Sequence, residues 1–417
     1  MNHKLNIIVL VALVVKIILL FFTNYDLKMN PDEEHNYQIA YNHQHGLGYT
    51  IYVPEINTYK QTSFHGSFPV FIYEFLLKND IKKDIWILFI HGFSVLLFLL
   101  SVIYFYKLSI LFTDSENAAL LSVITYCSYP SILYFIGSLF LYENLVLPVL
   151  IIIVYKLIHG FKAGYKTADY LTIPIAIAVS CLLRPQLIMI YALLLTVTSV
   201  YIIITKKYNH LLLILVTIST TIILHIPILE KTNKQFGKPV LSTQTGFELL
   251  QGHHPEARGS WMGNWQDSTN HLFKYADSNI KQLGFLNELE ESDARKQLAI
   301  NWIKEHAVQE LILQFRKLAI YFLPKNFEVL PGYNFLNPIN LLIHLLFLSF
   351  LLNRIYKKRI LLNELLLLMP VLGSIILSLI FFVGYRWRYY AEPFMIIFAW
   401  QLINEIRIHT TEKLNNK

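Results

Sequence analysis

Long apolar runs alternate with polar segments along the whole chain, starting with LNIIVLVALVVKIILLFF at residues 5–22. As helices, runs of this length can cross a hydrocarbon layer of about 30 Å. The pattern predicts an all-α polytopic membrane protein with about ten transmembrane helices, in which residues 1–417 form a single integral membrane domain. The expected spans are residues 5–23, 85–106, 118–137, 139–156, 170–184, 186–205, 210–229, 338–353, 361–383 and 393–406.

Basic residues divide the polar segments into two sets. One set carries Lys and Arg, as in NRIYKKR at 353–359 and in the C-terminal tail, and loops of this kind face the cytoplasm. The opposite set contains two long segments, which we expect to be outer-face loops at 24–84 and 230–337. Loops of this length are usually functional, so we expect the chemistry on the outer face of the membrane.

The segment VQELILQFRKLAIYFLP at 308–324 is apolar, but it carries three charged residues with amphipathic spacing. If it spanned the membrane, NRIYKKR would face outward, against the distribution of basic residues in membrane proteins. We therefore expect 308–324 to be an interfacial helix within the large outer loop.

The composition agrees with a membrane protein. Hydrophobic residues make up 55% of the chain and charged residues 15%, with a mean hydropathy of +0.45, whereas soluble domains carry about 25% charged residues. The net charge of +7 comes mostly from the short loops, so it does not indicate binding of nucleic acid. Both cysteines lie in apolar runs, where neither a disulfide nor a metal site is expected. The sequence also lacks a glycine-rich nucleotide-binding loop.

An acidic segment directly follows the first span. MNPDEEHNYQIAYNHQHGLGYT at 29–50 contains Asp32, Glu33 and Glu34 in succession. These acids would begin a helix well, since negative charge is favourable at a helix N-terminus. Alternatively, one of them is a general base whose proton affinity is raised by nearby hydrocarbon and aromatic rings. The two interpretations are compatible, because a helix start would hold the carboxylate in place.

Arginines stand at two of the expected outer ends of spans. GYRWRYYAEPF at 384–394 places Arg386 and Arg388 after the ninth span, and LLRPQ places Arg184 at another outer turn. Positive charge on the outer face requires compensation. An anionic lipid phosphate would supply it, and so would an ion pair with Glu392 or with the acidic segment.

Aromatic and hydrogen-bonding residues gather in LLQGHHPEARGSWMGNW at 249–265. Flat aromatic faces and polar donors suit the binding of a sugar ring, and a structured surface loop is the alternative. The candidate substrate-binding residues of the whole chain are Tyr37, Glu143, His253, His254, Arg258 and Trp261.

In order along the chain, these motifs resemble those of the GT-C superfamily of lipid-phosphosugar-dependent glycosyltransferases. The nearest similarity is to glycosyltransferase family 39, the bacterial branch related to protein O-mannosyltransferases and aminoarabinose transferases. The segments that carry the resemblance are PDEEHNYQIAYNHQHGLGYT, SFHGSFPVFIYEFLL, YENLVLPVL, LLRPQLIMI, GHHPEARG and YRWRYYAEPF. The chain departs from the family pattern where His253–His254 replaces an Asn pair and where Tyr142 precedes Glu143.

The resemblance implies an inverting glycosyltransferase that moves a sugar from a polyprenyl-phosphate donor to an acceptor hydroxyl at the outer face of a bacterial cytoplasmic membrane. Asp32 would be the general base, and Glu33 would support it or bind the acceptor. The donor phosphate would be bound by Arg184, Arg386 and Arg388. The acceptor would be a lipid, a glycan or a protein, in a setting of membrane lipid. No cofactor is required, and a divalent cation held by Asp32, Glu33, Glu143 and histidines is the open alternative.

Two other classes of protein are alternatives. A transporter or flippase of lipid-linked saccharides would explain the basic and aromatic outer residues, but it predicts polar residues through the centres of the spans, where they are scarce. A polysaccharide polymerase or ligase would use arginine and histidine of the large outer loop, and Asp32 would then be dispensable.

Overall fold

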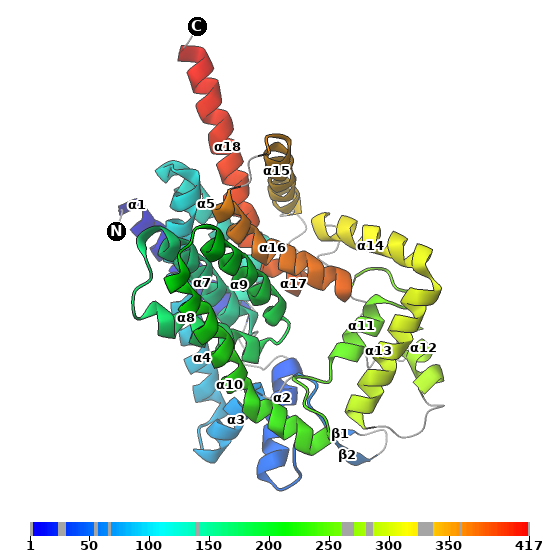
Figure 1. Cartoon of the computed structure of the whole chain (residues 1–417). Helices are drawn as coiled ribbons and strands as arrows, with labels where there is room; N and C mark the ends of the chain where they lie inside the picture. The colour runs from blue at the N-terminus through cyan, green and yellow to red at the C-terminus, as the bar shows by residue number, and fades with distance from the viewer. Residues whose placement is uncertain are drawn as a thin grey trace.

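The computed structural model describes residues 3–23, 31–53, 57–65, 68–137, 142–260, 271–280, 287–323, 337–358 and 361–415. Within these ranges the chain is mostly helical, with one antiparallel hairpin formed by β1 and β2 (Figure 1). The elements are α1 (His3–Thr23), α2 (Pro31–Gln44), β1 (Thr50–Val53), β2 (Thr58–Gln61), α3 (Phe68–Lys78), α4 (Lys83–Thr113), α5 (Glu116–Ser128), α6 (Pro130–Gly137), α7 (Glu143–Ala163), α8 (Asp169–Leu183), α9 (Leu187–Ile204), η2 (Tyr208–His210), α10 (Leu211–Phe236), α11 (Thr245–Gly252), α12 (His271–Ile280), α13 (Glu288–Glu305), α14 (Ala307–Phe322), α15 (Asn337–Tyr356), α16 (Leu362–Ile380), α17 (Tyr385–Tyr389) and α18 (Glu392–Asn415).

Six described helices are long and apolar enough to cross a membrane. They are Lys83–Thr113, Glu143–Ala163, Leu187–Ile204, Tyr208–Phe236, Pro338–Tyr356 and Asn363–Ile380. Helices occupy every one of the expected positions, but the expected number of about ten spans is not confirmed. One reason is length, since α8 has 15 residues and a span needs about 20.

The expected span 118–137 is interrupted in the structure. Helix α5 ends at Ser128, Tyr129 is extended with φ −69° and ψ 135°, and α6 begins at Pro130. A proline disfavours the helical conformation in the residue before it, which explains the break. The chain therefore forms two short helices where one apolar run predicted a single long helix.

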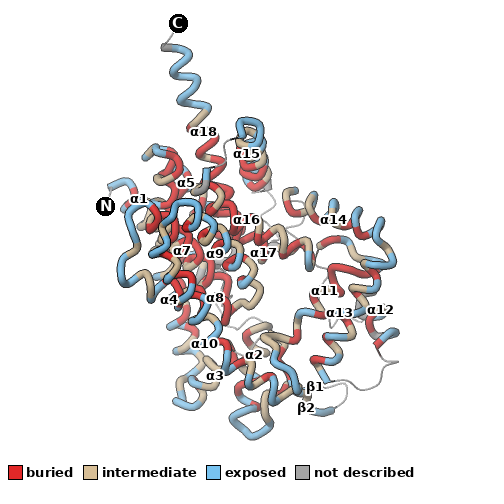
Figure 2. The backbone as a smooth tube through the Cα atoms, in the orientation of Figure 1, coloured by how far each residue is buried: buried red, intermediate tan, exposed pale blue. Residues whose placement is uncertain are grey.

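The buried core lies along α7, α16 and the first half of α18, at the centre of the helix bundle (Figure 2). Helix α4 packs on α7, α8 on α10, α9 on α16, and α15 on α18. Apolar side chains of α7 and α18, such as Leu150, Val154 and Phe394, are fully buried. The N-terminus of α7, with Glu143, lies next to α17, with Arg386, just before α18. Both residues belong to the candidate site described below.

The two long segments have structure of their own. Helices α2 and α3 pack together beside the hairpin, in which Thr50 pairs with Gln61. The second segment forms α11–α14, and its helices enclose a small separate core of Leu250, Ala276, Ile280 and Ala299. The backbone N–H of Thr243 donates to the carbonyl of Ser63 at 3.2 Å, and the rings of Phe64 and Phe247 lie 5.2 Å apart. These contacts join the two segments.

Helix α14 matches the expected interfacial helix. Its outward side chains Val308, Leu311, Ile312 and Phe315 are 58–70% exposed. On the inner face, the charged residues Glu310 and Lys317 are buried. An apolar exposed face suits contact with lipid. The position of α14 at a membrane surface stays a prediction.

Candidate functional site

Four ends of helices bring charged side chains together. Asp32 lies in the first turn of α2, Glu143 begins α7, Arg184 follows the last residue of α8, and Arg386 lies in α17. Pro31 begins α2 and three acids form its first turn, as expected for a helix N-terminus. We call Asp32, Glu143, Arg184 and Arg386 the charged cluster.

The contacts in the charged cluster run from one acid to the other through the arginines. Arg386 Nη1 donates to Asp32 Oδ2 at 2.8 Å, and its Nε lies 4.0 Å from Glu143 Oε1. Arg184 Nη2 donates to the same Glu143 oxygen at 2.7 Å. The Glu143 side chain is 2% exposed, but those of Asp32 and Arg386 are 26% and 34% exposed. Asp32 and Arg386 are therefore open to a ligand. Buried Glu143 lies against both Arg184 and Arg386.

Asp32 is held ionised. Burial raises the pKa of its carboxyl, but the charges of Arg386 and Arg184 outweigh burial and keep this pKa well below its usual range. In the free protein Asp32 therefore lacks the raised proton affinity that was expected of one of these acids. The reason is the ion pair with Arg386, which the sequence predicts only as an alternative to phosphate binding.

His65 is a site residue that the motif analysis did not single out. Its Nε2 lies 3.9 Å from Asp32 Oδ1, and its ring meets that of His35 edge-on with 5.0 Å between centroids. Burial lowers the pKa of His65 to about 3, so the ring is neutral at neutral pH. His65 therefore borders Asp32 as a polar, uncharged side chain.

Glu33, unlike Asp32, is buried in the protein interior. It is 1% exposed and accepts a hydrogen bond from the hydroxyl of Tyr73. Tyr142 also bonds to Glu33, and the Tyr142 hydroxyl accepts from Asn36 Nδ2 at 3.2 Å. Burial raises the pKa of Glu33 to about 8 despite these hydrogen bonds. Glu33, rather than Asp32, therefore has the raised proton affinity that was expected of one of these acids.

The protonation of Glu33 predicts a pH dependence of stability. The folded protein keeps the proton of Glu33 up to about pH 8, whereas an unfolded glutamate loses it near pH 4.3. Stability from this group is complete below the unfolded pKa and is lost as pH rises through the folded value. We expect Glu33→Gln, a permanently neutral isostere, to flatten the fall in unfolding temperature between about pH 5 and 8. Glu34→Gln, at the half-exposed neighbour paired with Lys83, should leave the fall unchanged, and an unchanged slope in Glu33→Gln would contradict a neutral Glu33.

Arg388 lies outside the charged cluster, and its binding of phosphate stays a prediction. Its Nε donates to Glu392 Oε1 at 2.8 Å, and its Nη1 donates to the carbonyl of Tyr321 at 3.3 Å. Glu392 also accepts a hydrogen bond from Ser131. Arg388 is 6% exposed, so this arginine neutralises a buried carboxylate and positions α17 rather than facing a ligand.

His253 is part of a buried contact between α11, α14 and the end of α16. Its Nδ1 lies 3.0 Å from Glu310 Oε2, and its Nε2 lies 2.7 Å from the carbonyl of Ile380 and 3.1 Å from Lys317 Nζ. Lys317 also donates to the carbonyl of Phe381 at 2.7 Å. Both ring nitrogens thus have protein partners, and substrate binding by His253 stays a prediction. The contact fixes the chain just before α17 and Arg386.

Removing this contact should destabilise the protein. Lys317 is fully buried, and Lys317→Met would remove its hydrogen bonds to the backbone carbonyls of Leu379 and Phe381. We expect a loss of about 2 kcal/mol or more, measured as a lower unfolding temperature of the detergent-solubilised protein. Lys304→Met, the same substitution at an exposed position of α13, should have little effect. Equal unfolding temperatures for the two variants would contradict a stabilising role of Lys317.

The other candidate substrate residues are dispersed. His254 is buried, its Nδ1 accepts from the backbone N–H of Glu256 at 3.2 Å, and burial lowers its pKa to about 4. Arg258 is exposed, and Trp261 lies outside the described residues. Tyr37 packs edge-on against Tyr73, so it supports the carboxylate pocket of Glu33. Substrate contact by these residues stays a prediction.

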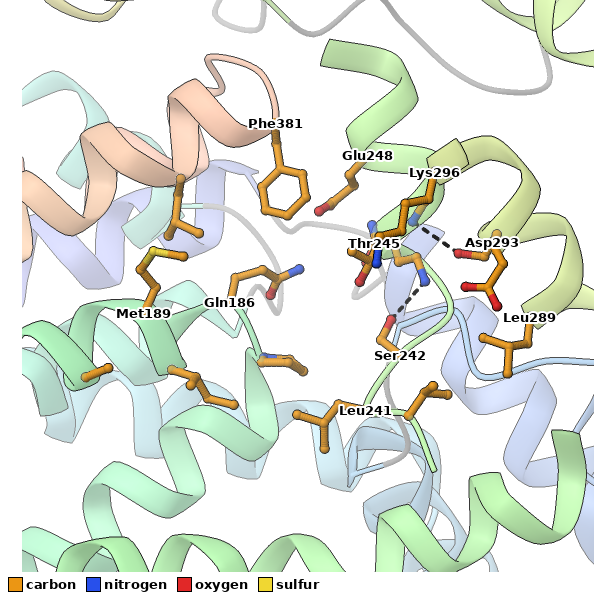
Figure 3. Close-up of a pocket in the computed structure, with 18 of the residues that line it drawn as sticks. Gln186, Met189, Leu241, Ser242, Thr245, Glu248, Leu289, Asp293, Lys296 and Phe381 are labelled. Carbon is orange, nitrogen blue, oxygen red and sulfur yellow. Dashed lines mark hydrogen bonds between the residues drawn. The ribbon is translucent and has the colours of Figure 1, made fainter. Parts of the chain in front are cut away.

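A cavity of about 730 Å³ adjoins the charged cluster (Figure 3). One wall comes from α9 and the end of α16, and the other from α11, α13 and the segment before α11. Pro185 and Gln186, which directly follow Arg184, line it together with Glu248. Burial raises the pKa of Glu248 to about 7, although the charge of Arg184 and a hydrogen bond from Gln186 lower it. Glu248 lies just outside the motif at 249–265, so only the fold identifies it.

A metal-binding arrangement was the open alternative for the acids. Within the described ranges, no group of three or more His, Cys, Asp or Glu side chains has the geometry to hold a metal ion. The side chain of Arg386 lies between Asp32 and Glu143. In this arrangement the positive charge beside the two carboxylates is a guanidinium.

No protein-family model matches the chain, and no curated protein matches it in sequence. Among solved structures, it is similar over 99% of its length to the archaeal oligosaccharyltransferase AglB from Archaeoglobus fulgidus, determined in complex with an inhibitory peptide and a dolichol-phosphate. The TM-score is 0.49, the sequence identity is 13%, and this chain covers 52% of the AglB chain. A similarity at this level defines neither a family nor an activity.

Proposed function

We propose that the protein is a GT-C-type glycosyltransferase, which moves a sugar from a polyprenyl-phosphate donor to an acceptor hydroxyl at the outer face of the membrane. The observation that carries the proposal is the direct contact between Asp32 and Arg386, with Arg184 on the same charged cluster. A base and two permanent cations thereby converge at a partly open position next to a cavity. This combination suits attack by a hydroxyl with departure of a phosphate.

In the proposed reaction, the acceptor oxygen attacks the anomeric carbon of the sugar. The bond between that carbon and the phosphate oxygen breaks, and the phosphate leaves with the electron pair. Asp32 takes the proton of the acceptor hydroxyl. A single displacement of this kind inverts the configuration at the anomeric carbon.

The arginines have two roles in this proposal. Arg184 and Arg386 would stabilise the charge that develops on the leaving phosphate. Arg386 is partly exposed, so an incoming phosphate can compete with Asp32 for its guanidinium. Binding of the donor would then release Asp32 from its ion pair and raise its proton affinity at the moment when a base is needed. Glu143, fixed against Arg184 at 2.7 Å, would keep the cations in place.

The first test uses membranes that contain the protein and a panel of polyprenyl-phosphate hexoses and pentoses. We expect release of free polyprenyl phosphate from at least one donor, above the level of membranes without the protein. A flippase would move the intact donor across sealed vesicles without cleaving it. Translocation without release would contradict the proposal.

A further inference from the structure

The cavity beside the charged cluster has two walls of different chemistry. Ile188, Met189, Ala192, Leu193 and Thr196 form one stripe along α9, because residues three and four apart share a helix face. This stripe extends about 12 Å along the helix axis. Leu377 of α16 and Phe381, which directly follows α16, continue the apolar wall. A hydrocarbon chain that enters from the membrane would fit against this wall.

The opposite wall, which we call the polar wall, carries most of the polar side chains of the cavity, beside Val240, Leu241 and Leu289. Ser242, Thr245 and Glu248 line it from α11 and the segment before it, and Asp293 lies at an exposed position, 51% accessible. Glu248 is 8% exposed, and Figure 3 shows its side chain directed toward the side of the cavity where Gln186 and Phe381 lie. Buried carboxyl and amide groups of this kind recognise hydroxyl groups through directional hydrogen bonds.

The two walls meet next to Arg184. Gln186 lies two residues beyond Arg184, and the charges of Arg184 and Arg386 act on Glu248. A phosphate on the charged cluster would therefore have the cavity immediately beside it. A sugar joined to that phosphate would lie within reach of the polar wall, and the prenyl chain would lie along α9.

On this basis, and resting on the proposed function, we infer that Glu248 is a specificity-determining residue, which binds hydroxyl groups of the sugar in the polyprenyl-phosphate donor together with Gln186. Glu248 would act on the sugar and Arg184 on the phosphate. The two residues would therefore recognise different parts of the donor. A donor without sugar retains the Arg184 contact and lacks the Glu248 contact.

The test compares binding of farnesyl phosphate with that of farnesyl-phosphoryl hexoses and pentoses to the purified full chain in nanodiscs. We expect Glu248→Ala to lower the affinity for the best-bound sugar conjugate by about tenfold or more. The affinity for farnesyl phosphate should change by less than about twofold. Glu248→Gln, which keeps the size and part of the hydrogen bonding, should weaken the conjugate less. Arg184→Gln should weaken the binding of both farnesyl phosphate and the sugar conjugate.

Glu305→Ala is the matched control, since it removes a carboxylate from an exposed position of α13 outside the lining of the cavity. It should leave both ligands unchanged. Equal weakening of both ligands by Glu248→Ala, or no weakening of either, would overturn the role of Glu248 while leaving the proposed function standing. Failure of the wild type to bind farnesyl phosphate or any conjugate would overturn the proposed function, and the role of Glu248 with it.

Discussion

Replacing Asp32 by Asn is expected to lower the rate of sugar transfer by about 10²- to 10⁴-fold, the usual contribution of a general base. The amide keeps the shape of the carboxylate and can still lie beside Arg386, but it cannot accept the acceptor proton. Donor binding should persist, because Arg386 loses a competitor for the phosphate when the charge of Asp32 is removed. The measurement is the initial rate of polyprenyl phosphate release together with donor affinity.

Asp84→Asn is the matched control for Asp32→Asn. Asp84 also lies in the first turn of a helix, α4, and it is exposed. Its substitution should change the rate by less than about twofold, as for surface positions away from a site. Turnover by Asp32→Asn at the wild-type rate would move the chemistry to another part of the chain, such as the histidine and arginine segment that a ligase would use.

Replacing Arg386 by Gln is expected to lower the maximal rate by about 10²- to 10³-fold, as when one preorganised donor to a developing negative charge is removed. The variant should also change the pH profile. Burial raises the pKa of Asp32 and Arg386 lowers it, so without Arg386 the pKa of Asp32 rises. The residual rate should then fall as the pH is lowered and Asp32 becomes protonated, over a range where the wild type keeps an ionised carboxylate.

The control for Arg386→Gln is Arg316→Gln, at an exposed position of α14. The measurement is the pH dependence of kcat/KM for both variants and the wild type. A wild-type rate in Arg386→Gln would contradict its role at the leaving phosphate. A reduced rate with an unchanged acidic limb would contradict its effect on the proton affinity of Asp32.

The positions of the helices could be predicted from the sequence because each apolar run has one dominant physical requirement, burial away from water. The start of α2 could also be predicted, since Pro31 and the acids after it favour a helix N-terminus. The break at Pro130 follows from the same local rules, although hydrophobicity alone predicts one continuous helix there. The number of spans depends on helix length, which apolar runs indicate only approximately.

The roles of individual charged residues depended on packing that the sequence does not contain. Arg386 and Arg388 are two residues apart, yet one pairs with Asp32 at the open cluster and the other with buried Glu392. Glu33 is protonated more readily than Asp32 because Glu33 is fully buried, whereas the charge of Arg386 keeps Asp32 ionised. Only the fold brings these distant segments together.

His253 and Glu248 also show that a motif does not determine the role of a side chain. His253 belongs to a conspicuous motif, and its partners Glu310 and Lys317 lie more than fifty residues away, so its structural role could not be read locally. Glu248 belongs to no motif, and its environment is made by α9, α11 and α16. Sequence motifs contain several residues of the candidate site, and tertiary packing decides which side chains face the cavity.

The central claim is that the sugar leaves the donor by displacement at its anomeric carbon. The most direct measurement uses the donor identified in the panel, prepared with a heavy oxygen isotope at the atom that joins the anomeric carbon to phosphorus, and follows the label by mass spectrometry. The account predicts that all of the label remains in the released polyprenyl phosphate and that none enters the sugar product. Label in the sugar would mean that the bond from oxygen to phosphorus breaks instead, which would contradict a glycosyltransferase built on Asp32 and the charged cluster.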